Sequence, residues 1–220
     1  MAQRHYRRCK MVKITIIIEG GEPVKNLKRE RDLRTTAMSP DGINLRSAWH
    51  KLLAVSEDGI KPRGSYKTSV TSYKRHLAAS ESSLLLVDSD GVDRIQWLKD
   101  KDLEEYSENV FFMVQQQEAW FLSQPKSIEA VYGNHKDIAS NISLLLDKYA
   151  HCEAIKYPKS EFTNLLNRCF VKPKYNIKQQ AELIEKLDIV LLRNTFSEVK
   201  NLLDRIDKIA KIAKIKELSN

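Results

Sequence analysis

The chain has 220 residues, a length that suits one α/β domain with helical additions. Hydrophobic residues make up 42% of it and charged residues 30%, which supplies a packed core and excludes global disorder. A net charge of +8 favours a polyanionic partner such as a nucleic acid, and no stretch approaches the roughly 20 apolar residues of a membrane span.

The amino-terminal residues 1–11 form a basic arm, and we expect no signal peptide there. Glu19 and Glu22 follow too soon to leave room for an apolar signal core. The cysteines Cys9, Cys152 and Cys169 are odd in number and far apart, which favours reduced thiols over a disulfide framework. We therefore expect a soluble, cytoplasmic protein without membrane association.

Three apolar runs predict strands. Residues 13–18 are β-branched and nearly unbroken, as in a strand that is buried on both faces. Residues 84–87 and 110–114 are the second and third candidates. Helical segments over residues 22–33, 43–56 and 70–79 lie between the first two strands. This alternation predicts an α/β fold with a small, mostly parallel sheet flanked by helices, over residues 12–133.

Helices dominate the rest of the chain. A helix begins at Glu118, Pro125 suits the first turn of the next one, and Gly133 suits its carboxyl cap. Residues 134–220 are expected to form a helical region packed on the α/β domain, with helices over residues 135–149, 161–168, 179–192 and 195–218. Thr195 and Glu198 have the spacing of a capping box. An apolar stripe on the last helix favours core packing and consists of Phe196, Val199, Leu203, Ile206, Ala210 and Ala213.

Each predicted strand is followed by acidic residues. Glu19 follows the first strand, Asp88 and Asp90 follow the second, and Glu118 follows the third. The carboxyl ends of neighbouring parallel strands share one edge of a sheet, where open α/β proteins build their sites. Carboxylates gathered there would repel one another unless a cation lay among them, and oxygen ligands favour Mg²⁺ or Mn²⁺. Such a site polarises a phosphodiester and activates water for in-line attack.

These motifs resemble the Toprim domain of topoisomerases, primases and overcoming-lysogenization-type nucleases. The resemblance is carried by Glu19-Gly20, by Asp88-Ser89-Asp90-Gly91 about 70 residues later, and by Glu118-Ala119-Trp120. Within that group the chain is similar to short Toprim-like proteins of phage-defence or mobile loci, which are encoded beside an ABC/SMC-type ATPase. Members also carry a Tyr-x-x-Lys segment and a later Ser/Thr-Phe, matched here by Tyr175-Asn176-Ile177-Lys178 and Thr195-Phe196.

The resemblance implies a role for each matching residue. Glu19 would be a general acid or base or a metal ligand, Asp88 and Asp90 would hold Mg²⁺, and Glu118 would add a ligand or orient water. Lys178 would face a phosphate. The implied function is a metal-dependent nuclease that cleaves DNA or RNA, including tRNA, as a defence effector with an ATPase partner. Assembly as a homo-oligomer stays open.

The chain departs from the family in its first motif. The family often reads Glu-Gly-Lys-Thr-Glu, whereas this chain has Glu19-Gly20-Gly21-Glu22-Pro23. Glu22 therefore either replaces the second acid or only opens the next helix.

A basic group around Gly64 is either a phosphate-backbone contact or a solvated face, and consists of Lys61, Arg63, Lys67, Lys74 and Arg75.

Other roles can be assigned to the aromatic residues beside Glu118, to the lysines of the last helix and to Asp88. Trp120 and Phe121 suit core packing beneath the site better than base stacking, and the lysine strip of the last helix, Lys208, Lys211 and Lys214, suits a solvent face. A phosphatase with Asp88 as nucleophile is disfavoured because such a loop belongs near the amino terminus. A Toprim-like subunit that binds nucleic acid or the ATPase without cutting stays open.

Overall fold

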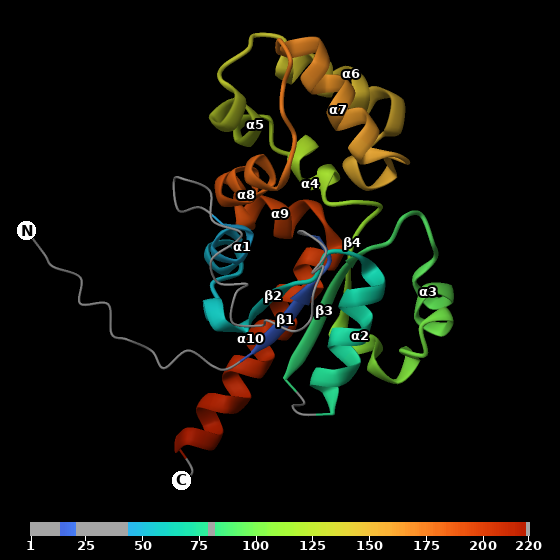
Figure 1. Cartoon of the computed structure of the whole chain (residues 1–220), viewed down its shortest axis with the longest axis vertical. Helices are drawn as coiled ribbons and strands as arrows, with labels where there is room; N and C mark the ends of the chain where they lie inside the picture. Colours follow the sequence, from blue (N-terminus) through green and yellow to red (C-terminus); the bar gives the residue numbers. More distant parts are fainter. Residues whose placement is uncertain (1–13, 21–43, 79–81, 219–220) are drawn as a thin grey trace, which may run out of the picture.

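The computed structural model describes residues 14–20, 44–78 and 82–218, and in this part of the chain it contains a four-stranded, fully parallel sheet (Figure 1). Its spatial order is β2-β1-β3-β4. The strands are β1 (Thr15–Ile18), β2 (Ile60–Pro62), β3 (Ser83–Asp88) and β4 (Val110–Met113). Helices flank the sheet and fill the carboxy-terminal region. The predicted fold class, α/β with a small parallel sheet and a helical extension, is confirmed.

β1 and β3 form the centre of the sheet because their side chains are apolar on both faces. Ile16, Ile17 and Ile18 are fully buried, as is the run from Leu84 to Val87. The two strands pair in parallel, with Ile16 beside Leu84 and Ile18 beside Leu86. β1, β3 and β4 are the three strands that the sequence predicts.

The edge strand β2 is not predicted by the sequence. It has three residues, only Ile60 is buried, and Pro62 is tolerated because the strand lies at an edge. Its position depends on pairing with β1, where Ile16 lies beside Ile60. A Cβ on Gly59 would lie 2.1 Å from the backbone oxygen of Ile14, so the close approach of these two backbone segments requires glycine.

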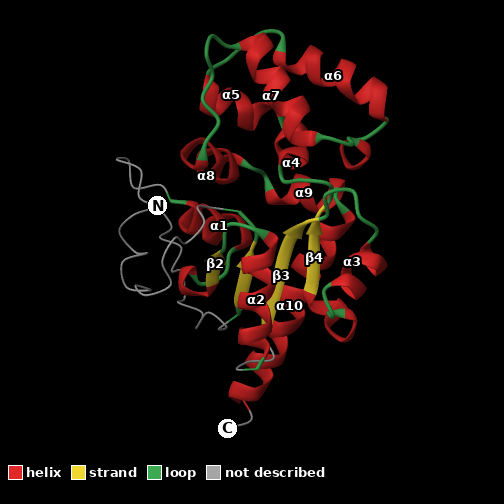
Figure 2. Cartoon of the chain, turned by 45° about the vertical axis from the view of Figure 1, so that its right-hand side comes forward, coloured by secondary structure: helices red, strands yellow, loops and turns green. Residues whose placement is uncertain are grey.

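Helices flank both faces of the sheet (Figures 1 and 2). On one face Tyr73 of α2 (Tyr66–Leu77) and Trp97 of α3 (Arg94–Asp100) belong to one buried apolar cluster with Ile17 of β1, and Trp97 meets Phe112 of β4 edge-on. On the other face α1 (Leu45–Leu53) and α10 (Ser197–Leu218) contribute to the larger core, with Trp49 from α1 and Leu202 from α10. Phe196, Val199 and Ile206 of the predicted stripe are buried, so this part of the stripe is core, as expected.

The remaining helices lie beyond the carboxyl ends of the strands, which point toward them (Figure 2). They share the larger core with the sheet, since Phe162 of α7 belongs to the same apolar cluster as Ile16. They are α4 (Glu118–Leu122), α5 (Pro125–Tyr132), α6 (Ile138–Tyr149), α7 (Pro158–Cys169), α8 (Ile177–Lys186) and α9 (Ile189–Thr195). Short 3-10 turns are η2 (Glu57–Gly59), η3 (Glu104–Asn109) and η4 (Cys152–Ala154).

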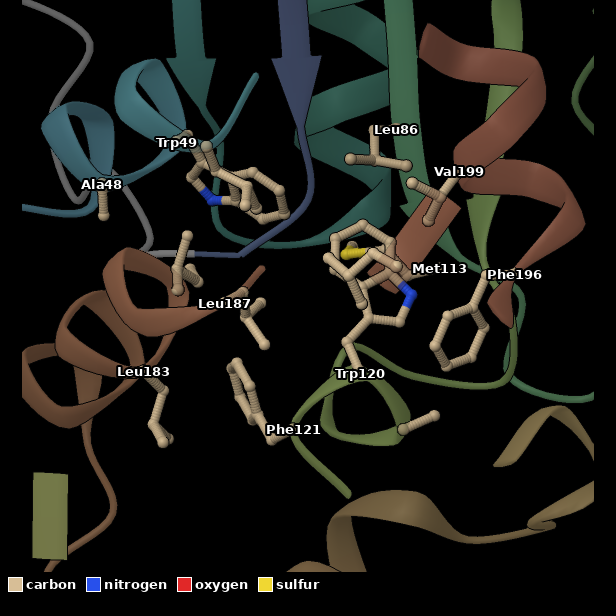
Figure 3. Close-up of a cluster of buried hydrophobic side chains, with 14 of the residues drawn as sticks. Ala48, Trp49, Leu86, Met113, Trp120, Phe121, Leu183, Leu187, Phe196 and Val199 are labelled. Atoms are coloured by element: carbon tan, nitrogen blue, oxygen red, sulfur yellow. The ribbon is translucent and has the colours of Figure 1, made fainter. Parts of the chain in front are cut away.

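Trp120 lies at the junction between the sheet and these helices (Figure 3). It is 1% exposed, and its ring meets Trp49 edge-on at 5.8 Å and Phe196 at 6.2 Å between centroids. Phe121 is fully buried as well. Both side chains are core residues, as expected, and they anchor the short helix α4 that begins with Glu118.

Several local expectations are wrong. The helix expected over residues 179–192 is two helices, because the Asp188 backbone is bonded to the Gln124 side chain and the Asp188 carboxylate caps α9. Thr195 is the last residue of α9 and does not cap α10, and Glu198 binds Arg94 instead. The sequence interpretation also missed α3, which Asp93 caps. By contrast, Pro125 and Gly133 bound α5 as expected.

Some expectations fall on residues outside the described part. They are the basic arm over residues 1–11, the helix over residues 22–33, and the role of Glu22. Among the described helices, none combines the length and apolarity that crossing a bilayer requires.

Candidate active site

The four predicted acids gather at the carboxyl edge of the sheet. Glu19 follows β1, Asp88 ends β3 and Asp90 comes two residues later. Glu118 is the first residue of α4, which follows β4. Because β1, β3 and β4 are adjacent and parallel, these positions face one another across a single edge.

Glu19 is tied directly to Asp88. The backbone N–H of Asp88 donates to Oε2 of Glu19 at 3.1 Å. The backbone N–H of Glu19 donates to the Leu86 oxygen at 2.8 Å, which extends the pairing of β1 with β3. Burial raises the pKa of the Glu19 carboxyl to about 7, and the Asp90 charge adds to the rise. Backbone hydrogen bonds from Asp88 and Tyr66 oppose it. Glu19 is therefore an acid that titrates near neutral pH.

Asp88 lies at the centre of the four acids. Burial raises its pKa well above the usual range, and the charges of Glu19, Glu118 and Asp90 raise it further. The backbone N–H of Gln117, just before α4, donates to Oδ1 of Asp88 at 3.2 Å and acts in the opposite direction. The carboxyl groups of Glu19, Glu118 and Asp90 therefore each lie close enough to Asp88 to disfavour its charged form.

Asp90 occupies a tight turn that is fastened to the segment after β4. Its φ of 47° is left-handed, and Gly91 follows with φ 79°. The Asp90 N–H donates to the Gln115 oxygen at 2.9 Å, and Nε2 of Gln116 donates to Oδ1 of Asp90 at 3.2 Å. The turn exposes the Asp90 side chain at the rim of the site.

Glu118 is the most enclosed of the four acids by solvent exposure of the whole residue, at 6%. The hydroxyl of Tyr175, just before α8, donates to its Oε1 at 2.7 Å. Burial and the Glu118 charge raise the pKa of Tyr175 well above its ordinary value, so the hydroxyl stays protonated as a donor. The sequence interpretation noted Tyr175 only within the Tyr-x-x-Lys segment and gave it no role.

Three glutamines, Gln116, Gln117 and Gln180, also join the site without having been predicted. Nε2 of Gln180, in α8, donates to Oε1 of Gln117, and it lies 3.7 Å from where a Cβ on Gly20 would be. A further link comes from α7, whose Lys159 N–H donates to Oε1 of Gln116 at 3.2 Å. The run of glutamines after β4 thus connects the acids to the helical region.

The two predicted phosphate-binding lysines lie in first turns of helices that reach the site. Lys67 is exposed in α2, next to the Tyr66 backbone that bonds Glu19. Its Nζ lies 6.0 Å from the centroid of the Tyr66 ring, which Lys101 approaches to 4.9 Å. Lys178, in α8, pairs with Glu182 at 3.7 Å.

The donor set suits a hard divalent cation, because it consists of carboxylates whose mutual repulsion such an ion would relieve. Within residues 14–20, 44–78 and 82–218, however, no three side chains of His, Cys, Asp or Glu are placed as ligands of one ion. Binding through three of the acids would thus need side-chain rearrangement. A comparison of the chain with protein-family models, with curated proteins and with solved structures finds no match.

Proposed function

We propose that the chain is a Mg²⁺- or Mn²⁺-dependent nuclease of Toprim type that hydrolyses phosphodiesters of DNA or RNA. The observation that carries the proposal is that Glu19, Asp88, Asp90 and Glu118 lie at one edge of the sheet. The charges of the other three acids raise the pKa of Asp88. Burying several like charges together is unfavourable, and a bound cation would offset the repulsion between them.

Each residue has a role in this proposal. Asp88 and Asp90 would hold the cation, and Glu118 would complete its ligands or orient the water. Glu19, with a pKa near 7, is suited to take or give a proton at neutral pH. A bound Mg²⁺ or Mn²⁺ would polarise the phosphodiester and lower the pKa of an attacking water.

Lys67 and Lys178 would bind the phosphate backbone on either side of the reacting group. Both lie in the first turn of a helix, where the helix dipole favours an anion. The net charge of +8 supports a polyanionic substrate. Nothing in these residues selects DNA over RNA, and tRNA belongs among the substrates to be tested.

The biological setting of the proposal comes from the motif resemblance. On this proposal the chain would act in the cytoplasm as the effector of an anti-phage defence system, controlled by an ABC/SMC-type ATPase. Assembly of the effector as a homo-oligomer is compatible with that setting.

The second candidate is a non-catalytic subunit that binds nucleic acid or the ATPase. It is favoured by the absence, among the described side chains, of three placed as ligands of one ion. Asp88→Asn separates the two candidates, because a binding-only subunit would keep its biological activity when this carboxylate is removed.

The test is a cleavage assay of the chain with and without its ATPase, on single-stranded DNA, duplex DNA and tRNA. We expect cleavage with Mg²⁺ or Mn²⁺ and none with a chelator. Asp88→Asn should reduce the rate about 100-fold or more. Asp147→Asn, an exposed acid on α6, is the matched control and should cleave normally. Absence of metal-dependent cleavage of every substrate, with the ATPase present, would contradict the proposal.

A further inference from the structure

Tyr175 contacts the candidate site from the helical region, far from the strands in sequence. Its hydroxyl donates to Oε1 of Glu118 at 2.7 Å, a short bond to a carboxylate that is nearly inaccessible to solvent. One oxygen of Glu118, Oε1, is therefore engaged by a donor from the helical region.

The position of this hydroxyl is determined by the packing of the helical region. The Tyr175 ring meets Phe162 of α7 edge-on, at 5.1 Å and 71° between planes. The backbone next to it is fixed as well, because the Tyr132 hydroxyl of α5 donates to the Lys174 oxygen at 2.8 Å. Two helices therefore hold the donor in place, and they do so independently of Glu118.

We propose that Tyr175 is a positioning residue, which holds Glu118 so that a single oxygen, Oε2, faces the divalent cation. The inference rests on the proposed metal site and deepens it, because it assigns control of ion selectivity to the helical region. A carboxylate held to one oxygen suits the six-coordinate Mg²⁺ or Mn²⁺. Ca²⁺, in contrast, takes six to eight ligands and often binds both oxygens of a carboxylate. The Tyr175 hydroxyl would thus disfavour Ca²⁺.

The experiment measures binding of Mn²⁺ and of Ca²⁺ to the full chain by titration calorimetry. It compares the wild type with Tyr175→Phe, which removes the hydroxyl and keeps the ring on Phe162. The matched control is Tyr149→Phe, because the Tyr149 hydroxyl also donates to a glutamate, Glu161, at 3.0 Å, outside the four acids. Thermal unfolding of each variant checks that the fold is kept.

We expect Tyr175→Phe to weaken Mn²⁺ binding about tenfold, as for other residues that orient a metal ligand. Ca²⁺ binding should weaken less or strengthen, so that the ratio of the two affinities shifts toward Ca²⁺, whereas Tyr149→Phe should leave both affinities unchanged. The inference would be overturned if Tyr175→Phe left both affinities unchanged or weakened Mn²⁺ and Ca²⁺ binding equally. It would also be overturned if Tyr149→Phe shifted the ratio of the two affinities in the same way. A wild-type chain that binds neither ion would overturn the proposed metal site itself.

Discussion

The carboxylate of Glu19 accepts a hydrogen bond from the backbone N–H of Asp88, 69 residues further along the chain. This contact follows from the sheet register, because Ile18 lies beside Leu86 and the residues that follow the two strands must therefore meet. A slip of one residue would turn every side chain of β1 to the other face of the sheet. The fold thus fixes the backbone positions of Glu19 and Asp88 relative to each other before any ligand binds.

Glu19→Gln should stabilise the metal-free protein above pH 7. The raised pKa means that Glu19 is protonated in the folded state and ionised in the unfolded state between about pH 4.5 and 7. Stability therefore falls as pH rises through this window. We expect a gain on the order of 1 kcal/mol at pH 8, allowing for solvent screening of this partly exposed group, and none below pH 4.5. Urea unfolding across the pH range measures it.

The control for this prediction is Glu57→Gln, at an exposed position in η2. The difference in free energy of unfolding between Glu57→Gln and the wild type should not change over the same pH window. A stabilisation by Glu19→Gln that stayed constant from pH 4 to pH 8 would show that burial of the charge is not its cause.

Divalent cations should stabilise the folded chain at pH 8. An ion that binds only the folded state at about 100 times its dissociation constant adds roughly 2.7 kcal/mol. For a chain of this size the melting temperature should then rise by several degrees, at about 2–4 °C for each kcal/mol. Scanning fluorimetry with Mn²⁺ and Mg²⁺ measures the shift, which Asp88→Asn should abolish. An equal shift in that variant would place the ion elsewhere.

Glu198 is predicted to matter for stability and not for chemistry. Its carboxylate accepts two bonds from Nη1 of Arg94, at 3.0 and 3.1 Å, and one from the N–H of Phe112 on the edge strand β4, at 3.0 Å. Glu198→Ala leaves these donors without their acceptor at a mostly buried position, which should cost about 2–4 kcal/mol in urea unfolding.

Lys200→Ala serves as the comparison for Glu198. Lys200 pairs with Asp204 at 2.8 Å, one turn along the exposed side of α10, and its removal should cost less than about 0.5 kcal/mol. Equal losses in the two variants would mean that Glu198 does not join α10 to the sheet.

Lys67→Ala should weaken binding of nucleic acid, measured in a chelator so that no cleavage occurs. Removing one phosphate contact should lower the slope of log affinity against log salt by about 0.7–0.9. Lys208→Ala, on the exposed strip of α10, should leave affinity and slope unchanged. Fluorescence anisotropy over a salt series provides both values, and equal effects of the two substitutions would contradict a specific role for Lys67.

The parts of the fold that the sequence predicts are those determined by local composition. β1 and β3 are apolar on both faces, and that pattern is visible without knowledge of their neighbours. β2 has one buried residue, Ile60, and becomes a strand only because β1 offers its edge. The break after α8 depends on Gln124, 64 residues away from Asp188, so no local pattern reveals it.

The same distinction applies to the site. Glu19, Asp88, Asp90 and Glu118 could be found because each lies at the carboxyl end of a predicted strand or shortly after it, and the strands are parallel. Tyr175 and Gln180 come from a helical region whose packing the sequence does not specify, and they reach the acids only through tertiary contacts. The Tyr-x-x-Lys segment was the single signal that included Tyr175, it did not reach Gln180, and it carried no geometry.

The most direct measurement of the central claim is anomalous scattering from crystals of the chain grown with Mn²⁺. We predict a peak at the carboxyl edge of the sheet, roughly 2.0–2.5 Å from oxygens of at least three of Glu19, Asp88, Asp90 and Glu118. A peak elsewhere, or none at an Mn²⁺ concentration that saturates binding in solution, would contradict the account.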